Sequence, residues 1–184
     1  MPTDEASRTV QVTAPFDEVL ATIRDVESQV TWIPEILQAE LLEEYEDGLP
    51  ATAHFKAQAP VGTDEYTLEY DHSDDGMTWS LVSGRLQTGQ DGRYALRAVG
   101  DEVTEVTYTL RISHHLPLPG FVRSRVIKGL VESTVSGLKA YLEEPVEDDG
   151  EDSGGSGDGG SGDGGSGDSS SGDSSGDGGA VAGE

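Results

Sequence analysis

The chain has 184 residues, with 36 acidic and 11 basic side chains, a formal net charge of −25 and no cysteine. This charge argues against nucleic acid as a partner, because such affinity comes largely from Lys and Arg at phosphates, and the missing cysteine excludes disulfides and thiol chemistry. Eleven acidic residues follow Val146, and the other 25 share residues 1–146 with every basic residue.

The N-terminal part predicts one strand and two short helices. Residues 1–8 are polar and acidic, unlike a signal peptide, and no segment approaches the ~18 consecutive apolar residues of a membrane helix. We therefore expect a cytoplasmic protein without integral membrane association. Residues 9–13 alternate as a strand does. Pro15 suits the first turn of a helix, and a second helix is expected over 26–30 because Pro34 disfavours helix just before it.

The middle of the chain has a period near two, interrupted by turn pairs such as Asp47-Gly48 and Asp91-Gly92. Such pairs between alternating runs are typical of hairpins. The expected strands are 36–46, 50–60, 64–73, 77–84, 86–98 and 103–115. Their apolar residues fall on one face, which predicts an antiparallel sheet with one wet side.

After the break at 116–120, a long helix is expected over 121–143, where apolar residues recur at helical spacing until Pro145. Beyond it, Ser-Gly-Asp repeats without any aromatic or large apolar residue. Such a segment cannot bury enough surface to offset its ordering entropy. We predict a folded domain over 1–145 and a disordered acidic Gly/Ser/Asp-rich tail over 146–184. A weak divalent-cation sponge is the alternative function of that tail.

This element order resembles the SRPBCC superfamily, which includes START-related lipid-binding domains, polyketide cyclase/dehydrase-like proteins and coenzyme Q-binding proteins. Segments 12–19 and 23–25 with Trp32, and then segments 66–81, 90–96 and 104–108, carry the resemblance, which spans about residues 7–143. It implies an α+β helix-grip fold, in which a curved antiparallel sheet of about seven strands wraps a long C-terminal helix. It also implies a cavity between them for lipids, quinones or polyketides.

The candidate cavity residues are mainly aromatic side chains on the inward strand faces, with residues from the two helical regions. They are Trp32, Phe55, Tyr66, Tyr70, Trp79, Tyr94, Tyr108, His114, Ile127 and Val131. Such rings could simply fill a core, or could line a pocket in which the Tyr hydroxyls orient a ligand. Small residues expected to face the helix, namely Ala53, Ala57, Ala59 and Ser80, favour a hollow.

Catalytic signals are weak. His54 and His72 are expected at exposed positions, whereas His114 continues an inward face and could act as an acid or base, or could simply lie near water at a strand end. No HxH, HExxH or cysteine cluster is present. We therefore assign no catalytic residue, metal or cofactor.

Arg123, Arg125 and Lys128 form a basic cluster that either solvates the helix and pairs with nearby Glu, or meets an acidic headgroup or a transient protein partner. Three functions remain open. The first is binding or transport of a hydrophobic small molecule. The others are a polyketide cyclase/dehydrase of the aromatase type, with Tyr and His114 as acid–base groups, and a noncatalytic interaction module with a filled core.

Overall fold

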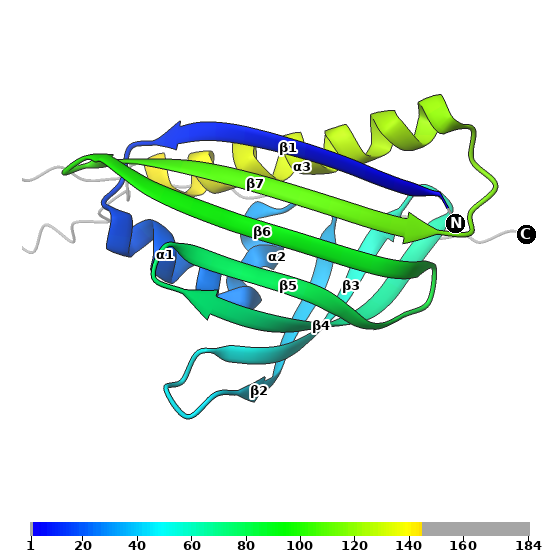
Figure 1. Cartoon of the computed structure of the whole chain (residues 1–184), viewed down its shortest axis with the longest axis horizontal. Helices are drawn as coiled ribbons and strands as arrows, with labels where there is room; N and C mark the ends of the chain where they lie inside the picture. Colours follow the sequence, from blue (N-terminus) through cyan, green and yellow to red (C-terminus); the bar gives the residue numbers. More distant parts are fainter. Residues whose placement is uncertain (1, 145–184) are drawn as a thin grey trace, which may run out of the picture. The chain divides into compact units, whose positions relative to one another are not determined.

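One continuous antiparallel sheet and one long helix dominate the structure, a computed structural model that describes residues 2–144 (Figure 1). The predicted tail over 146–184 therefore lies outside the described residues. The elements in chain order are β1 (Thr3–Val12), α1 (Phe16–Arg24), the 3-10 turn η1 (Val26–Ser28), α2 (Gln29–Trp32), β2 (Ile36–Glu44), β3 (Pro50–Ala59), β4 (Gly62–Ser73), β5 (Gly76–Gly84), β6 (Gln87–Gly100), β7 (Val103–His114) and α3 (Gly120–Glu143).

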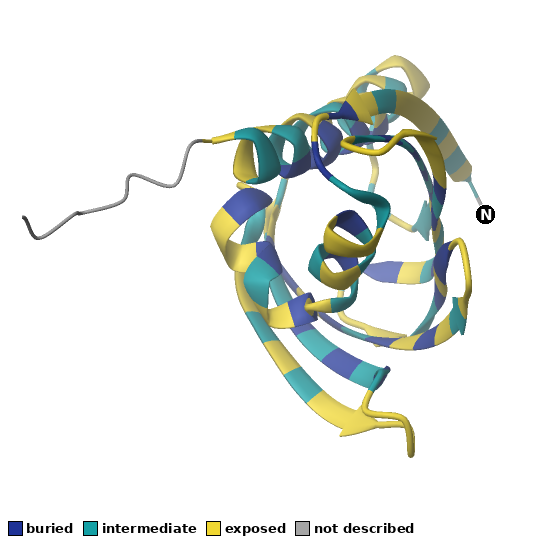
Figure 2. Cartoon of the chain, turned by 90° about the vertical axis from the view of Figure 1, so that its left-hand side faces the viewer, coloured by how far each residue is buried: buried dark blue, intermediate teal, exposed yellow. Residues whose placement is uncertain are grey.

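The strand order across the sheet is β1-β7-β6-β5-β4-β3-β2, and every neighbouring pair is antiparallel. All neighbours except β1 and β7 are therefore joined consecutively along the chain. The sheet curves, with α3 running along β1 and with α1 at the end opposite the N-terminus (Figures 1 and 2). This is the predicted α+β helix-grip fold.

The first strand begins at Thr3, six residues before the start that its alternation predicts. It is held by pairing with β7 along its whole length, from Thr3 opposite Ser113 to Val12 opposite Thr104. Hydroxyl pairs cross the two strands, including Thr3 to Ser113 at 2.8 Å. The polar residues 3–8 thus form a strand through tertiary pairing that a local apolar pattern does not reveal.

The second short helix also differs from the prediction. Residues 26–28 form a 3-10 turn, and α2 then continues to Trp32 instead of ending at Val30. The chain becomes extended at Ile33, which directly precedes Pro34, as the clash of a proline ring with a preceding helical residue requires. Asp25 begins the turn by accepting from the Ser28 backbone N–H.

The core lies between the concave face of the sheet and α3. Fully buried side chains include Val12, Phe55, Val106, Val135 and Leu138, which come from three strands and from the helix. Figure 2 shows the buried bands on the strands alternating with exposed ones, as expected for a sheet with one wet face. The end of α3 is tied to β1, since the Thr13 N–H donates to Glu143 and Lys139 donates to the Gln11 carbonyl.

Candidate functional site

A cavity of about 170 Å³ lies between the sheet and α3. Its walls come mainly from the inward faces of β3 to β7, from the β7–α3 loop and from α3 up to Thr134, with further residues from β1, α2 and the start of β2. An apolar cavity of ~150 Å³ is large enough to hold a molecule the size of benzene. The volume alone therefore admits a small apolar ring or a short chain.

The sheet wall of the cavity is aromatic because cross-strand partners bring rings together. Tyr70 pairs with Trp79, and Tyr94 pairs with Tyr108, at matching positions of neighbouring strands. Trp79 stacks on Tyr108 with ring centroids 5.8 Å apart, and Tyr94 lies 4.8 Å from Tyr108. A separate stacked pair, Phe55 and Tyr66, lies on β3 and β4 at 5.5 Å. Aromatic cross-strand pairs of this kind stabilise a sheet while presenting ring surface to its concave side.

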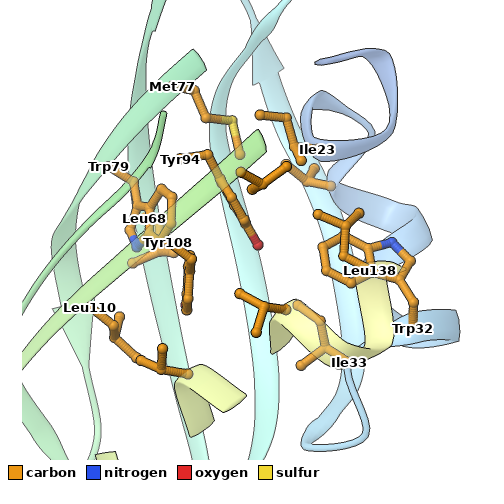
Figure 3. Packing of buried hydrophobic residues seen from close by; sticks show 14 of the residues in the cluster. Ile23, Trp32, Ile33, Leu68, Met77, Trp79, Tyr94, Tyr108, Leu110 and Leu138 are labelled. Carbon is orange, nitrogen blue, oxygen red and sulfur yellow. The ribbon is translucent and has the colours of Figure 1, made fainter. Parts of the chain in front are cut away.

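Four tyrosine hydroxyls belong to this wall and are neutral. Burial raises the pKa of Tyr66, Tyr70, Tyr94 and Tyr108 above the ordinary phenol value. Nearby phenols of the same group raise the pKa of the first three further, and Glu35 does so for Tyr108. For Tyr108, a hydrogen bond with Thr134 acts in the opposite direction and lowers the pKa. Figure 3 shows the Tyr94 hydroxyl pointing away from its strand into the interior, where it can donate a hydrogen bond.

One end of the cavity is polar. Asp64 at the start of β4 and Gln87 at the start of β6 line it, and their side chains are buried, with residue exposures of 5% and 7%. One Asp64 carboxylate oxygen accepts from the Leu86 N–H at 2.8 Å, and the other accepts from the Gln87 Nε2 at 3.0 Å. Gln90, also buried, lines the same cavity. We call Asp64, Gln87, Gln90 and the neighbouring His114 the polar end.

A half-buried charged cluster joins three elements beside the polar end. Asp4 on β1 accepts from Arg123 Nε at 3.1 Å, and its carboxylate lies 3.8 Å from His114 Nε2. The His114 Nδ1 accepts from the Leu116 N–H, so the neutral ring carries its proton on Nε2, which faces Asp4. Arg123 also donates to the Leu118 carbonyl. These contacts attach the β7–α3 loop to β1 and α3.

Eight of the ten candidate residues line the cavity. They are Phe55, Tyr66, Tyr70, Trp79, Tyr94, Tyr108, His114 and Ile127. Trp32 and Val131 are buried but lie outside the lining. Trp32 instead packs near α3, and its indole N–H donates to the Ser28 hydroxyl at 3.1 Å.

Three other expectations were wrong. His54 and His72 are half-buried, since His54 hydrogen-bonds Thr67 on the neighbouring strand and His72 hydrogen-bonds the Pro50 carbonyl. Ser80 does not face α3. Its hydroxyl donates to Glu69, because it alternates with Trp79 along β5 and so lies on the outer face of the sheet.

The basic cluster of α3 is divided between two environments. Arg123 lines the cavity and pairs with Asp4, whereas Arg125 and Lys128 are exposed and form no ion pair within residues 2–144. Positions 125 and 128 are three residues apart and share a helix face, from which position 123 is turned away. The three residues therefore do not act as one surface.

Sequence reasoning missed much of the polar end. Asp64 and Gln90 share the inward faces of Tyr66 and Tyr94, so the two-residue period carried a signal for both. Gln87 is out of phase with Tyr94, and it turns inward because the β6–β7 register is irregular between Gln87 and Gly89. Asp4 was missed because the strand was expected to begin only at residue 9.

Within residues 2–144, no group of three or more His, Asp or Glu side chains could hold a metal ion. Among the helices described here, none is long and apolar enough to cross a membrane.

A family model described as "Polyketide cyclase / dehydrase and lipid transport" matches residues 3–143 of the chain. No curated protein matches the sequence. A solved structure of a START superfamily protein from Mycobacterium smegmatis is 22% identical, with a TM-score of 0.71, over 76% of this chain and 97% of that one.

Two further solved structures are similar. The Zhui aromatase/cyclase from Streptomyces sp. R1128 is 15% identical, with a TM-score of 0.60, over 77% of this chain and 94% of that one. A fragment of a STAR-related lipid transfer protein from Xanthomonas axonopodis is 18% identical, with a TM-score of 0.59, over 76% of this chain and 86% of that one. At these identities the likeness shows the shared fold.

Proposed function

Because the chain belongs to the polyketide cyclase/dehydrase and lipid transport family, within the START-like SRPBCC superfamily, we propose that it binds a hydrophobic small molecule in its internal cavity. The family and the similar structures fit either hydrophobic ligand binding or polyketide cyclisation. Of these two, we propose binding or transport without chemical change.

The observation that carries this proposal is the aromatic cavity of about 170 Å³ between the sheet and α3. A buried methylene contributes ~0.8 kcal/mol, and association costs ~4 kcal/mol or more. A ligand of about ten apolar carbons would then bind, through this contribution alone, at about millimolar concentration or more weakly. The cavity also counts against an interaction module with a filled core.

Polyketide cyclisation is the second candidate, and the observation in its favour is that His114 lines the cavity beside Asp4. The geometry favours it less. Both ring nitrogens of His114 face protein groups, since Nδ1 accepts from the Leu116 N–H and Nε2 lies toward Asp4. The buried tyrosines hold their protons because burial raises their pKa, so they can donate hydrogen bonds but are poor bases near neutral pH.

Uptake of 1-aminonaphthalene, a neutral two-ring dye whose fluorescence responds to apolar surroundings, tests the binding function. We expect a saturable fluorescence rise with the native protein. Ala57→Phe should abolish it, because Ala57 lines the cavity and a ring there would fill much of the space. The matched control is Ala98→Phe, which adds the same ring at an exposed position of β6. Equal uptake by both variants would contradict the proposal.

Native mass spectrometry followed by organic extraction then separates the two candidates. A carrier should release a compound that returns unchanged after incubation with fresh protein. A cyclase acting by aldol closure and dehydration should convert its substrate to a product lighter by one water. Turnover that His114→Phe abolishes would replace the binding proposal with the enzymatic one.

A further inference from the structure

Within the polar end of the cavity, Asp64 and Gln87 offer hydrogen-bond acceptors that the protein itself leaves incompletely paired. Gln87 is 7% exposed, and its amide orientation follows from its contact with Asp64, because only the NH₂ group can donate to a carboxylate oxygen 3.0 Å away. The amide oxygen is then left buried, with no hydrogen-bond partner in the described part of the chain. A buried acceptor without a donor is unfavourable.

Asp64 adds negative charge to the same place. Its two oxygens accept from the Leu86 N–H and from Gln87 Nε2, and both donors are uncharged. Within residues 2–144 no Lys, Arg or His forms an ion pair with Asp64, and the nearby cation Arg123 is paired with Asp4. A carboxylate has about four lone-pair positions, so two donors leave acceptor capacity unused.

The residues around the polar end make the cavity amphiphilic, because an apolar wall lies next to polar side chains. Gln87 is the cross-strand partner of His114, and Asp64 lies two residues before Tyr66 on the same inward face of β4. Beyond Tyr66 the wall continues as Leu68 and Tyr70, next to Trp79. An apolar body and a polar group of one ligand would therefore meet different parts of the same cavity.

We infer, on the basis of the binding function proposed above, that the ligand carries a neutral or cationic hydrogen-bond donor, a hydroxyl or amino group on an apolar body, which binds at Asp64 and Gln87. The donor gives the Gln87 oxygen the partner that the chain does not supply, and the body lies against the aromatic wall. A ligand that ends in a carboxylate is disfavoured, because it would bring a second negative charge beside Asp64.

A series of naphthalenes that differ in one group tests this inference by calorimetric titration near neutral pH. Naphthalene has no polar group, 2-methoxynaphthalene only accepts hydrogen bonds, 2-naphthol donates one, and 2-naphthoate is anionic. We expect 2-naphthol to bind about tenfold more tightly than 2-methoxynaphthalene, and 2-naphthoate to bind most weakly.

The double variant Asp64→Leu/Gln87→Met tests whether these two residues cause the preference for a ligand that donates a hydrogen bond. Replacing both partners with apolar side chains avoids leaving one of the pair unpaired, and 2-naphthol should then lose its advantage over 2-methoxynaphthalene. The matched control is Gln38→Met, which removes an amide at an exposed position of β2 outside the cavity lining and should preserve the advantage. If the double variant does not fold, the series with the native protein still decides.

The possible failures are distinguishable. Equal binding of all four compounds, or tightest binding of 2-naphthoate, would overturn the donor preference and leave the binding function standing. Uptake of 1-aminonaphthalene without binding of any compound of the series would overturn the inference as well. If neither the dye nor any compound of the series binds, the proposed function itself is wrong.

Discussion

The indole of Trp79 lies against the bare backbone of Gly92, its register partner on the neighbouring strand, so closely that a Cβ on Gly92 would lie 2.0 Å from Trp79 Cζ2. The absence of a side chain at position 92 lets the indole lie along the sheet, stacked on Tyr108, while the cavity in front of it stays open. The hollow thus depends on the absence of a side chain at position 92.

Gly92→Ala should therefore push Trp79 from the sheet toward the cavity. Overpacking of this kind costs ~1–3 kcal/mol, and we expect 1-aminonaphthalene to bind about tenfold more weakly as the free volume shrinks. Urea unfolding followed by Trp fluorescence measures the first effect, and dye titration measures the second. Gly89→Ala on the same strand is the control, because its Cβ would meet Ser113 at 3.4 Å, an ordinary contact. Unchanged dye binding in Gly92→Ala would show that the missing side chain at position 92 does not keep the cavity open.

Two glycines of α3 should respond to alanine in opposite ways. A Cβ on Gly137 would lie 1.8 Å from the backbone oxygen of Trp32, so Gly137→Ala must separate α3 from α2. We expect it to lower the free energy of unfolding by ~1–3 kcal/mol. A Cβ on Gly129 meets nothing within 4 Å, and alanine there should add up to ~1 kcal/mol through helix propensity. Thermal melts of both variants measure this contrast, and equal midpoints would be incompatible with the close α2–α3 contact.

Alkaline pH should unfold the protein steeply. Burial raises the pKa of Tyr66, Tyr70, Tyr94 and Tyr108 in the folded state, so above the ordinary phenol pKa of ~10 the unfolded chain binds fewer protons than the folded one. The stability that these phenols contribute is fully present below that pH and is lost above it, at ~1.4 kcal/mol per pH unit for each phenol.

Urea midpoints measured from about pH 8 to about pH 12 follow this loss. In Tyr94→Phe, the free energy of unfolding should fall less steeply with pH, because one buried phenol fewer contributes to the slope. Stability at neutral pH should be nearly unchanged, since the Tyr94 hydroxyl forms no hydrogen bond within residues 2–144. An unchanged alkaline slope in this variant would show that Tyr94 ionises freely in the folded protein.

Arg123 should hold the β7–α3 loop in place. Arg123→Met removes the donor to Asp4 and to the Leu118 carbonyl, and charged hydrogen bonds of this half-buried kind contribute ~1–3 kcal/mol. We expect faster amide hydrogen exchange at Leu116 and Leu118. Arg125→Met is the matched control, because Arg125 is exposed on the same helix and forms no ion pair in the described chain. The same exchange rates in both variants would rule out the proposed attachment.

The inward faces of the strands were readable from the sequence, because the period of two places alternate side chains on one side of any strand. Ala53 and Phe55, or Tyr108 and Leu110, needed no tertiary information to be assigned to the core. Turn pairs and Pro34 marked most element ends for equally local reasons, namely backbone conformations that few residues adopt.

The features that depend on pairing across the sheet could not be predicted from the sequence. The strand over residues 3–8 exists because β7 pairs with it, and Gln87 faces inward because the β6–β7 register slips there. The close contacts of Gly92 with Trp79 and of Gly137 with Trp32 join residues far apart in the chain. Local periodicity therefore determined which side chains are inside. Only the tertiary structure decided which of them meet, and so where the interior stays hollow and which of its polar atoms lack partners, because these depend on register and distance between separate elements.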